Sequence, residues 1–173
     1  MKFDPAFYIL AFFLIFASIK DCLSYRIPNW ITLPALLTGI AYFSLARGYD
    51  GFLFSLSGAL TGFALLFIPY VIGGSGAGDV KLMAAVGSFL GPKGVFVVFL
   101  VSCVFGGVYA LLLMASRGML LDALRRYGRI LKTFLTTRHL IYIPPSQREK
   151  QLKICYGLAI ALGTASYWVW GAL

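Results

Sequence analysis

The sequence predicts an all-α, polytopic integral membrane protein with about six transmembrane helices and a basic amphipathic cytoplasmic segment, forming a single domain over residues 1–173. Composition is the first reason: 60% of the 173 residues are hydrophobic and 12% are charged, whereas a soluble domain is about one quarter charged. The second is the recurrence of long uncharged runs, and the third is the collection of basic residues between two of them. Too few polar side chains exist to cover a soluble core of this size.

The first two runs lie at the N-terminal end of the chain. Between Asp4 and Lys20 there are 15 uncharged residues, which is short for a helix crossing ~30 Å of hydrocarbon unless it continues past Lys20. A cleaved signal peptide is the alternative, but Ala17-Ser18-Ile19 lacks the A-x-A pattern. The second run covers 31–46 and has two prolines near its start, where proline costs a helix least.

The third run, 51–72, ends in a glycine-rich segment over 73–78 that has too many glycines to remain helical. The fourth run, 80–90, has 11 residues, and a helix of that length covers only ~16 Å. Either Lys81 therefore snorkels to the membrane surface, or the glycine-rich segment dips inward. Two further runs are long enough to span, 94–116 and 154–173.

Basic residues predict the orientation of these spans. If six spans alternate, 12 of the 15 Lys and Arg residues fall on one side, which we expect to be cytoplasmic, so that both termini lie outside the cytoplasm. Residues 117–153 carry nine of the 12. Apolar residues there recur at three- and four-residue steps, which predicts an amphipathic helix lying on anionic lipid of the inner leaflet: Leu120, Leu124, Tyr127, Leu131 and Phe134. The predicted topology accounts for the basic residues, so we expect no nucleic-acid partner. The sequence does not indicate which oligomeric state the protein has.

Two acidic residues stand out, because an ionisable residue at a membrane span is costly enough to suggest function. Asp21 follows the first run and Asp79 follows the glycine-rich segment, so alternating spans place both on the cytoplasmic side at similar depth. Two carboxylates that share a site cannot both ionise easily, so one can activate water while the other donates a hydrogen bond to a carbonyl. Gly76 and Gly78 would let an extended substrate backbone approach Asp79.

Structural roles are the alternative for both residues: Asp79 as the N-cap of the fourth helix, and Asp21 as the partner of Lys20 or Arg26. The sequence offers few residues for metal binding or for nucleophilic catalysis. The single histidine, His139, lies in the basic stretch, and three dispersed cysteines form no CxxC, so we expect no metal and interpret the cysteines as small packed apolar residues. The glycine-rich segment also lacks the GxGxxG spacing of a nucleotide site.

At these positions the chain resembles the GxGD aspartic peptidases of membranes, and more narrowly the type IV prepilin peptidase family. The family carries an Asp shortly before an R-[IL]-P-N segment, matched by Asp21 and Arg26-Ile27-Pro28-Asn29, and a GxGDxK motif, matched by residues 76–81. Near the C-terminus, residues 156–163 resemble the family's PYGxAxAxG segment, with Cys155 in place of its proline.

The resemblance implies that Asp21 and Asp79 are the catalytic pair of an endopeptidase that needs no cofactor. It implies a bacterial inner-membrane enzyme that cuts the leader of a type IV prepilin or pseudopilin on the cytoplasmic side. Larger relatives insert a cytoplasmic domain with paired CxxC motifs and also N-methylate the product. Because this chain has no CxxC and a short connection near residue 48, we expect a peptidase alone, similar to the small tight-adherence (Tad/Cpa, Flp pilus) branch.

Three further residues are candidates for substrate contacts or for tuning the aspartates: Arg26, Asn29 and Lys81. The alternative is that these residues have only a structural role, since basic residues are common at a cytoplasmic membrane border. For the whole chain, the main alternative is a small proton-coupled transporter or channel in which the same aspartates carry protons, although no second copy of the glycine-rich segment is present. A noncatalytic assembly scaffold is a third possibility.

Overall fold

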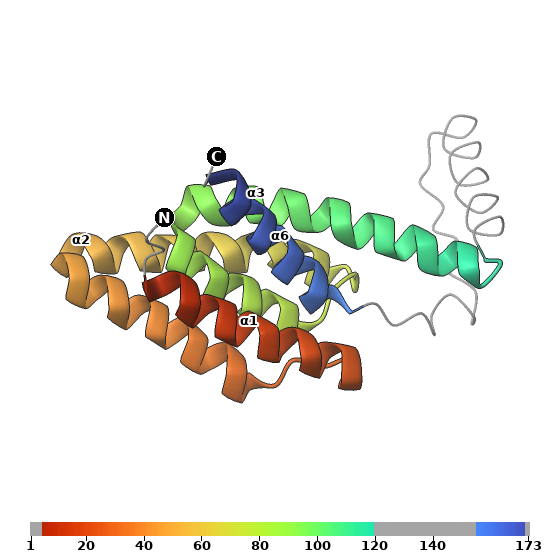
Figure 1. Cartoon of the computed structure of the whole chain (residues 1–173), viewed down its shortest axis with the longest axis horizontal. Coiled ribbons are helices and arrows are strands. Elements are labelled where there is room, and N and C mark those ends of the chain that lie inside the picture. Colours follow the sequence, from red (N-terminus) through yellow and green to blue (C-terminus); the bar gives the residue numbers. More distant parts are fainter. Residues whose placement is uncertain (1–4, 120–154, 172–173) are drawn as a thin grey trace. The chain divides into compact units, whose positions relative to one another are not determined.

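Four helices make up the computed structural model, which describes residues 5–119 and 155–171. They are α1 (Pro5–Ser24), α2 (Asn29–Val71), α3 (Ala77–Ser116) and α6 (Tyr156–Gly171), as Figure 1 shows. No strand occurs within these ranges, so the all-α prediction is confirmed for them. The helix α1 continues past Lys20 to Ser24, which supplies the length that its uncharged run lacked.

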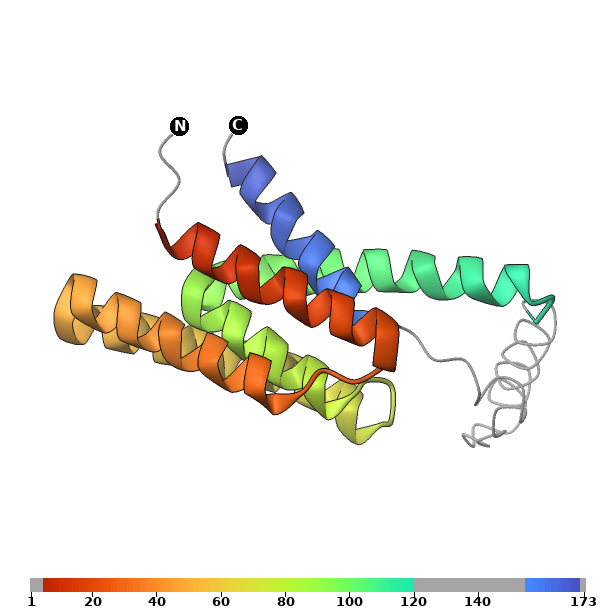
Figure 2. The ribbon, with the colours of Figure 1, turned by 60° about the horizontal axis from the view of Figure 1, so that its bottom comes forward.

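Two of the helices are broken at a glycine. Gly48 (φ 62°, ψ −139°) interrupts α2, and Gly91 (φ 70°, ψ 179°) interrupts α3; glycine adopts such positive φ values without steric cost. At each break the chain reverses, so that α2 is a helical hairpin and α3 turns back on itself (Figures 1 and 2). The breaks fall between the uncharged runs, but the one in α2 is tighter than the sequence suggests, since Tyr49 and Asp50 are already helical.

Three helices, α1, α2 and α3, are long and apolar enough to cross a membrane. This agrees with a multi-pass helical membrane protein, while the number of six spans stays a prediction. The chain divides into two compact units, residues 1–106 with 155–173, and residues 107–154. In the second unit the structure describes the end of α3 and a turn in which Gly118 has φ 66°. Most of the predicted amphipathic stretch, 117–153, lies outside the described residues.

Within the first unit, α1 packs against both α2 and α6. The crossing of α2 and α3 depends on glycines: a Cβ on Gly58 would meet the carbonyl oxygen of Gly87, and a Cβ on Gly87 would meet that of Gly58. A hydrogen bond beside the crossing joins the Ser55 hydroxyl to the Ser88 carbonyl at 2.7 Å. Small residues of this kind let membrane helices approach closely enough for their backbones to touch. The two glycines therefore set how closely the backbones of α2 and α3 approach each other.

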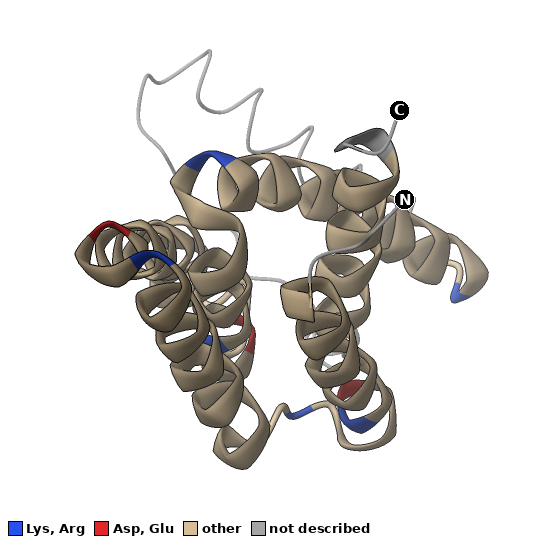
Figure 3. Cartoon of the chain, turned by 60° about the vertical axis from the view of Figure 1, so that its left-hand side comes forward, with Lys and Arg blue, Asp and Glu red and all other residues tan. Residues whose placement is uncertain are grey.

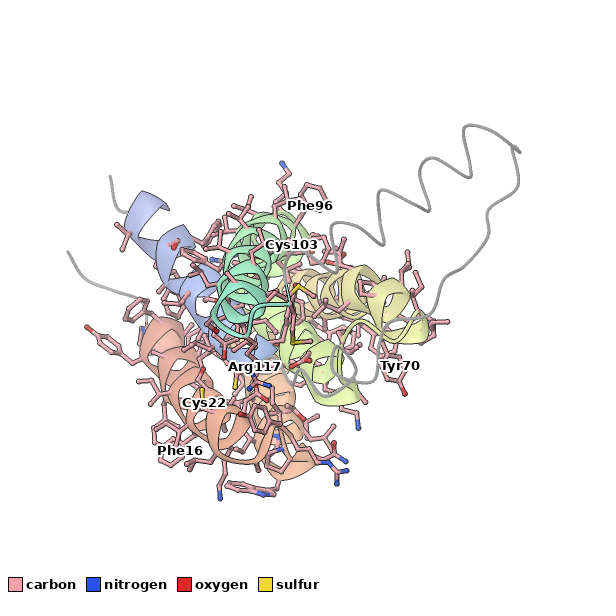
Figure 4. All side chains as sticks on the ribbon, turned by 90° about the vertical axis from the view of Figure 1, so that its right-hand side faces the viewer. Phe16, Cys22, Tyr70, Phe96, Cys103 and Arg117 are labelled. Atoms are coloured by element: carbon pink, nitrogen blue, oxygen red, sulfur yellow. The ribbon has the colours of Figure 1, made fainter. Side chains whose placement is uncertain are left out.

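Large apolar side chains also cover the outside of the first unit. Phe16 and Phe96 are 45% and 47% exposed and point away from the helices (Figure 4). Charged positions gather towards helix ends and leave long uncharged stretches between them (Figure 3). Lipid is the solvent that fits such a surface.

The expectation that the cysteines are packed inside the protein is correct for Cys155 but wrong for Cys22 and Cys103, which are exposed. The exposure of Cys22 and Cys103 has a simple physical reason. In a helix whose outer face meets hydrocarbon, a small apolar side chain gains little from burial against protein.

Candidate active site

Asp21 lies in the last turn of α1, and the periodicity of that helix directs its side chain inward. The buried residues Leu10, Leu14 and Ala17 recur at three- and four-residue steps, and the next position in this series is Asp21, whose side chain is 4% exposed. Its Oδ2 accepts a hydrogen bond of 2.8 Å from the backbone N–H of Gly157, in the first turn of α6. The alternative role of Asp21, as the partner of Lys20 or Arg26, is not seen among the described residues, where a backbone amide is its partner.

The helix α1 ends at Ser24, three residues after Asp21, because Tyr25 takes a positive φ of 52°, and the Tyr25 N–H donates to the Asp21 carbonyl at 2.7 Å. Such a conformation costs a non-glycine residue free energy and is used to end a helix sharply. The chain then continues without helical structure until α2 begins after Pro28.

Asp79 occupies the third position of α3, directly after the glycine-rich segment. Gly73 in that segment has φ 85°, and α3 begins at Ala77, so the predicted end of helical structure at these glycines is confirmed. The backbone N–H of Gly76 donates to Asp79 Oδ2 at 2.9 Å, and Asp79 is 8% exposed. Asp79 is thus not the N-cap itself. Its carboxylate reaches back from inside the first turn, as the third residue of a capping box does.

Ile27 joins the surroundings of the two aspartates. A Cβ on Gly78 would stand 3.0 Å from both the Cβ and the carbonyl oxygen of Ile27, and a Cβ on Gly157 would stand 3.0 Å from Ile27 Cδ1. Ile27 is 7% exposed and therefore packed between the helix that carries Asp79 and the amide that holds Asp21. The structure thus places the surroundings of two carboxylates that are far apart in sequence around one buried side chain.

The remaining sequence-predicted residues divide into two groups. Lys81 and Asn29 are brought together, since the Lys81 ammonium group donates to Asn29 Oδ1 at 2.8 Å. This bond ties the start of α2 to the first turns of α3. Arg26 is exposed, and within the described residues its side chain makes no hydrogen bond or ion pair with either aspartate. Gly76 and Gly78 flank Asp79 as expected, one as the donor to its carboxylate and the other against Ile27.

Two residues at the site, Tyr156 and Gly157, were not among the candidates derived from the sequence. Gly157 donates a hydrogen bond to Asp21, and the ring of Tyr156 packs against Gly106 of α3. The signal that could have found them is the match of residues 156–163 to a family segment, which was interpreted as similarity without a role.

The chemistry open to this arrangement is acid–base chemistry. Each carboxylate uses Oδ2 for one backbone amide, and among the described residues Oδ1 of each makes no hydrogen bond. No group of three His, Cys, Asp or Glu side chains in the described ranges could hold a metal ion. A pair of nearly buried carboxylates is also the chemical equipment of aspartic peptidases.

Comparison with known proteins agrees with this class. The sequence model of the type IV leader peptidase family matches residues 8–111, which include both aspartates. The chain belongs to this family. It is 31% identical over 117 residues to a prepilin leader peptidase/N-methyltransferase of Neisseria gonorrhoeae, with 64% of this chain and 41% of the relative covered.

Two other relatives carry the same name. The one of Aeromonas salmonicida (strain A449) is 31% identical over 116 residues, covering 63% of this chain and 40% of the relative. That of Bacillus subtilis (strain 168) is 36% identical over 98 residues, covering 56% and 39%. The chain thus spans about two fifths of the length of the curated relatives it matches. No solved structure matches the chain at a significant level.

Proposed function

We propose that this protein is a membrane aspartic endopeptidase that cleaves the leader peptide of type IV prepilins or pseudopilins, with Asp21 and Asp79 as its catalytic pair. The observation that carries the proposal is that Ile27 packs against both Gly78, next to Asp79, and Gly157, which holds Asp21, while each carboxylate is almost buried and accepts a hydrogen bond from one backbone amide. Membership of the type IV leader peptidase family supports the substrate class.

In the proposed reaction, one ionised carboxylate removes a proton from water, and the water oxygen attacks the scissile carbonyl carbon. The other carboxyl group donates a hydrogen bond to the carbonyl oxygen, where negative charge develops. When the C–N bond breaks, the leaving nitrogen takes a proton, and the products are a carboxylic acid and a free amine. The roles of the two aspartates stay open, because each has the same kind of amide partner.

The glycines near Asp79 support approach of a peptide backbone. Gly73 has no atom within 4 Å of the place where a Cβ would stand, and the carbonyl oxygen of Pro69, at 3.4 Å, is the nearest to that place on Gly74. An extended substrate could therefore lie close to the backbone of this segment before reaching Asp79. Lys81 lies two residues after Asp79 and donates a hydrogen bond to Asn29 at the start of α2, and both are proposed to support substrate binding at this end of the helices.

The finer assignments are proposals of the same kind. We infer that the site faces the cytoplasm across a bacterial inner membrane, since the basic residues would lie on that side. We also infer peptidase activity without methyl transfer and a Flp-like pilin substrate. The tight reversal at Gly48 and the absence of CxxC in the sequence support this, because the larger relatives carry an inserted CxxC domain.

The test is a cleavage assay in membranes. The full chain is mixed with a prepilin that carries a basic leader ending in Gly, and loss of the leader is followed on a gel. Asp21→Asn and Asp79→Asn should each lower the cleavage rate by about 10²–10⁴-fold. Asp50→Asn is the matched control, because Asp50 is an exposed acidic residue beside the turn in α2, and it should cleave at the wild-type rate.

Equal membrane expression of all four proteins has to be shown first. Cleavage at the wild-type rate by either Asn variant at the site would overturn the two-aspartate mechanism. Failure of the wild type to cut several prepilins would favour a proton-coupled transporter or a scaffold instead, which proton-flux measurements in vesicles would separate.

A further inference from the structure

The first turn of α6 contacts the surroundings of both aspartates. Its residue Gly157 donates its backbone N–H to Asp21 Oδ2 at 2.8 Å, and its carbonyl oxygen accepts a hydrogen bond of 3.4 Å from the Ser18 hydroxyl of α1. Both bonds join the same turn to the last two turns of α1. Together they fix the distance and the rotation of α6 relative to the helix that carries Asp21.

A Cβ at position 157 would fit only if its neighbours gave way by a few tenths of an ångström. A Cβ there would stand 3.0 Å from Asp21 Oδ2, 3.0 Å from Ile27 Cδ1 and 3.2 Å from Asp21 Cβ. All three distances are shorter than ordinary carbon contacts. The hydrogen bond from the Gly157 amide to Asp21 therefore depends on a close approach of the backbone that glycine, which has no side chain, allows.

Tyr156 anchors the same turn on α3. Its ring lies so close to Gly106 that a Cβ on this glycine would stand 2.9 Å from Tyr156 Cε2. Its hydroxyl lies 3.7 Å from the sulfur of Cys103. One turn of helix is thus fixed to α1 by Gly157 and to α3 by Tyr156.

We propose that the first turn of α6 is the positioning element of the active site, in which the Gly157 amide orients the Asp21 carboxylate and the Tyr156 ring anchors that turn on the part of α3 that follows the break at Gly91. The inference rests on the proposed peptidase function. It assigns Gly157 and Tyr156 as positioning residues, since neither is argued to touch the reacting atoms.

The test measures kcat and KM for prepilin cleavage in three variants and a control. Gly157→Ala should lower kcat by about tenfold, with KM within about twofold of wild type, because the Asp21 carboxylate has to give way by a few tenths of an ångström and a full ~1 Å shift of a catalytic group costs about 10²-fold. Gly107→Ala is the matched control, because it also places a Cβ on a helical glycine but meets no atom within 4 Å, and it should leave both constants unchanged. Tyr156→Ala should resemble Gly157→Ala, whereas Tyr156→Phe keeps the ring and should retain activity.

A second measurement does not depend on cleavage. A hydrophobic carbodiimide that modifies carboxyl groups is added to the detergent-solubilised full chain, and labelling of Asp21 and Asp79 is followed by mass spectrometry. Labelling of Asp21 should be several-fold faster in Gly157→Ala than in wild type or Gly107→Ala, with Asp79 little changed. Ser18→Ala, which removes the hydroxyl bonded to the Gly157 carbonyl, should give a smaller change in the same direction.

The positioning role is overturned if Gly157→Ala keeps the wild-type kcat, or if its loss of activity comes with unchanged labelling of Asp21. Failure of the proposed function has a different signature, because the wild type itself would then not cleave. In that case the labelling rates alone decide whether α6 holds Asp21.

Discussion

Gly87→Ala is expected to separate α2 from α3 and to reduce activity at a distance. The new Cβ would overlap the carbonyl oxygen of Gly58 and would stand 2.6 Å from its carbonyl carbon. To restore a carbon contact of about 3.5 Å, the two backbones have to move apart by ~1 Å. Overpacking of this kind costs about 1–3 kcal/mol of folding free energy, and the Ser55–Ser88 hydrogen bond beside the crossing is stretched as well.

The displacement reaches the active site because Gly87 and Asp79 lie on the same unbroken part of α3, before the interruption at Gly91. A shift of ~1 Å in a catalytic group lowers the rate by about 10²-fold. We therefore expect Gly87→Ala to lower both the melting temperature in detergent and kcat for prepilin cleavage, with Gly107→Ala unchanged in both. Wild-type melting and wild-type kcat in Gly87→Ala would refute the close backbone crossing.

Three further predictions concern the active site. Lys81→Ala and Asn29→Ala should each reduce cleavage less than about fivefold, and the double variant should be no worse than the stronger single one, since both remove one exposed hydrogen bond; additive losses would show that the two side chains act separately. Ile27→Ala should lower the free energy of unfolding by about 2–5 kcal/mol, measured by thermal melting with Val as the mild control, because the side chain is packed between two glycines at the site. A divalent-metal chelator should leave cleavage by purified enzyme unchanged; a loss restored by added metal would contradict a mechanism based on carboxylates alone.

Much of the helical layout follows from the sequence for physical reasons. Uncharged runs must become helices because hydrocarbon offers no partner for backbone polar groups, and the runs end where glycines or charges gather. The glycine-rich segment before Asp79 and the longer reach of α1 past Lys20 both follow from this argument. The placement of Asp21 and Asp79 at the same end of the helices follows from alternation of the spans.

Contacts between distant residues could not be derived in this way. The amide of Gly157 is 136 residues from Asp21, and no periodicity in α1 or α6 indicates which backbone group will meet that carboxylate. The crossing of Gly58 and Gly87 has the same character, since several other glycines in these helices are equally suited to a close approach. Exposure of Cys22 and Cys103 was missed because residues that face lipid and residues that face protein have similar polarity.

The choice of partners at the two aspartates has a consequence for the proposed chemistry. A lysine or arginine beside either carboxylate would hold it in its ionised form, whereas a backbone amide fixes its orientation and carries no net charge. Among the described residues, each aspartate is held by such an amide and neither forms an ion pair. Where two carboxylates share a site and neither is ion-paired, repulsion between them favours a state in which the pair shares one proton. That state is the one required of a site in which one carboxyl group accepts a proton from water while the other donates a hydrogen bond to the substrate carbonyl.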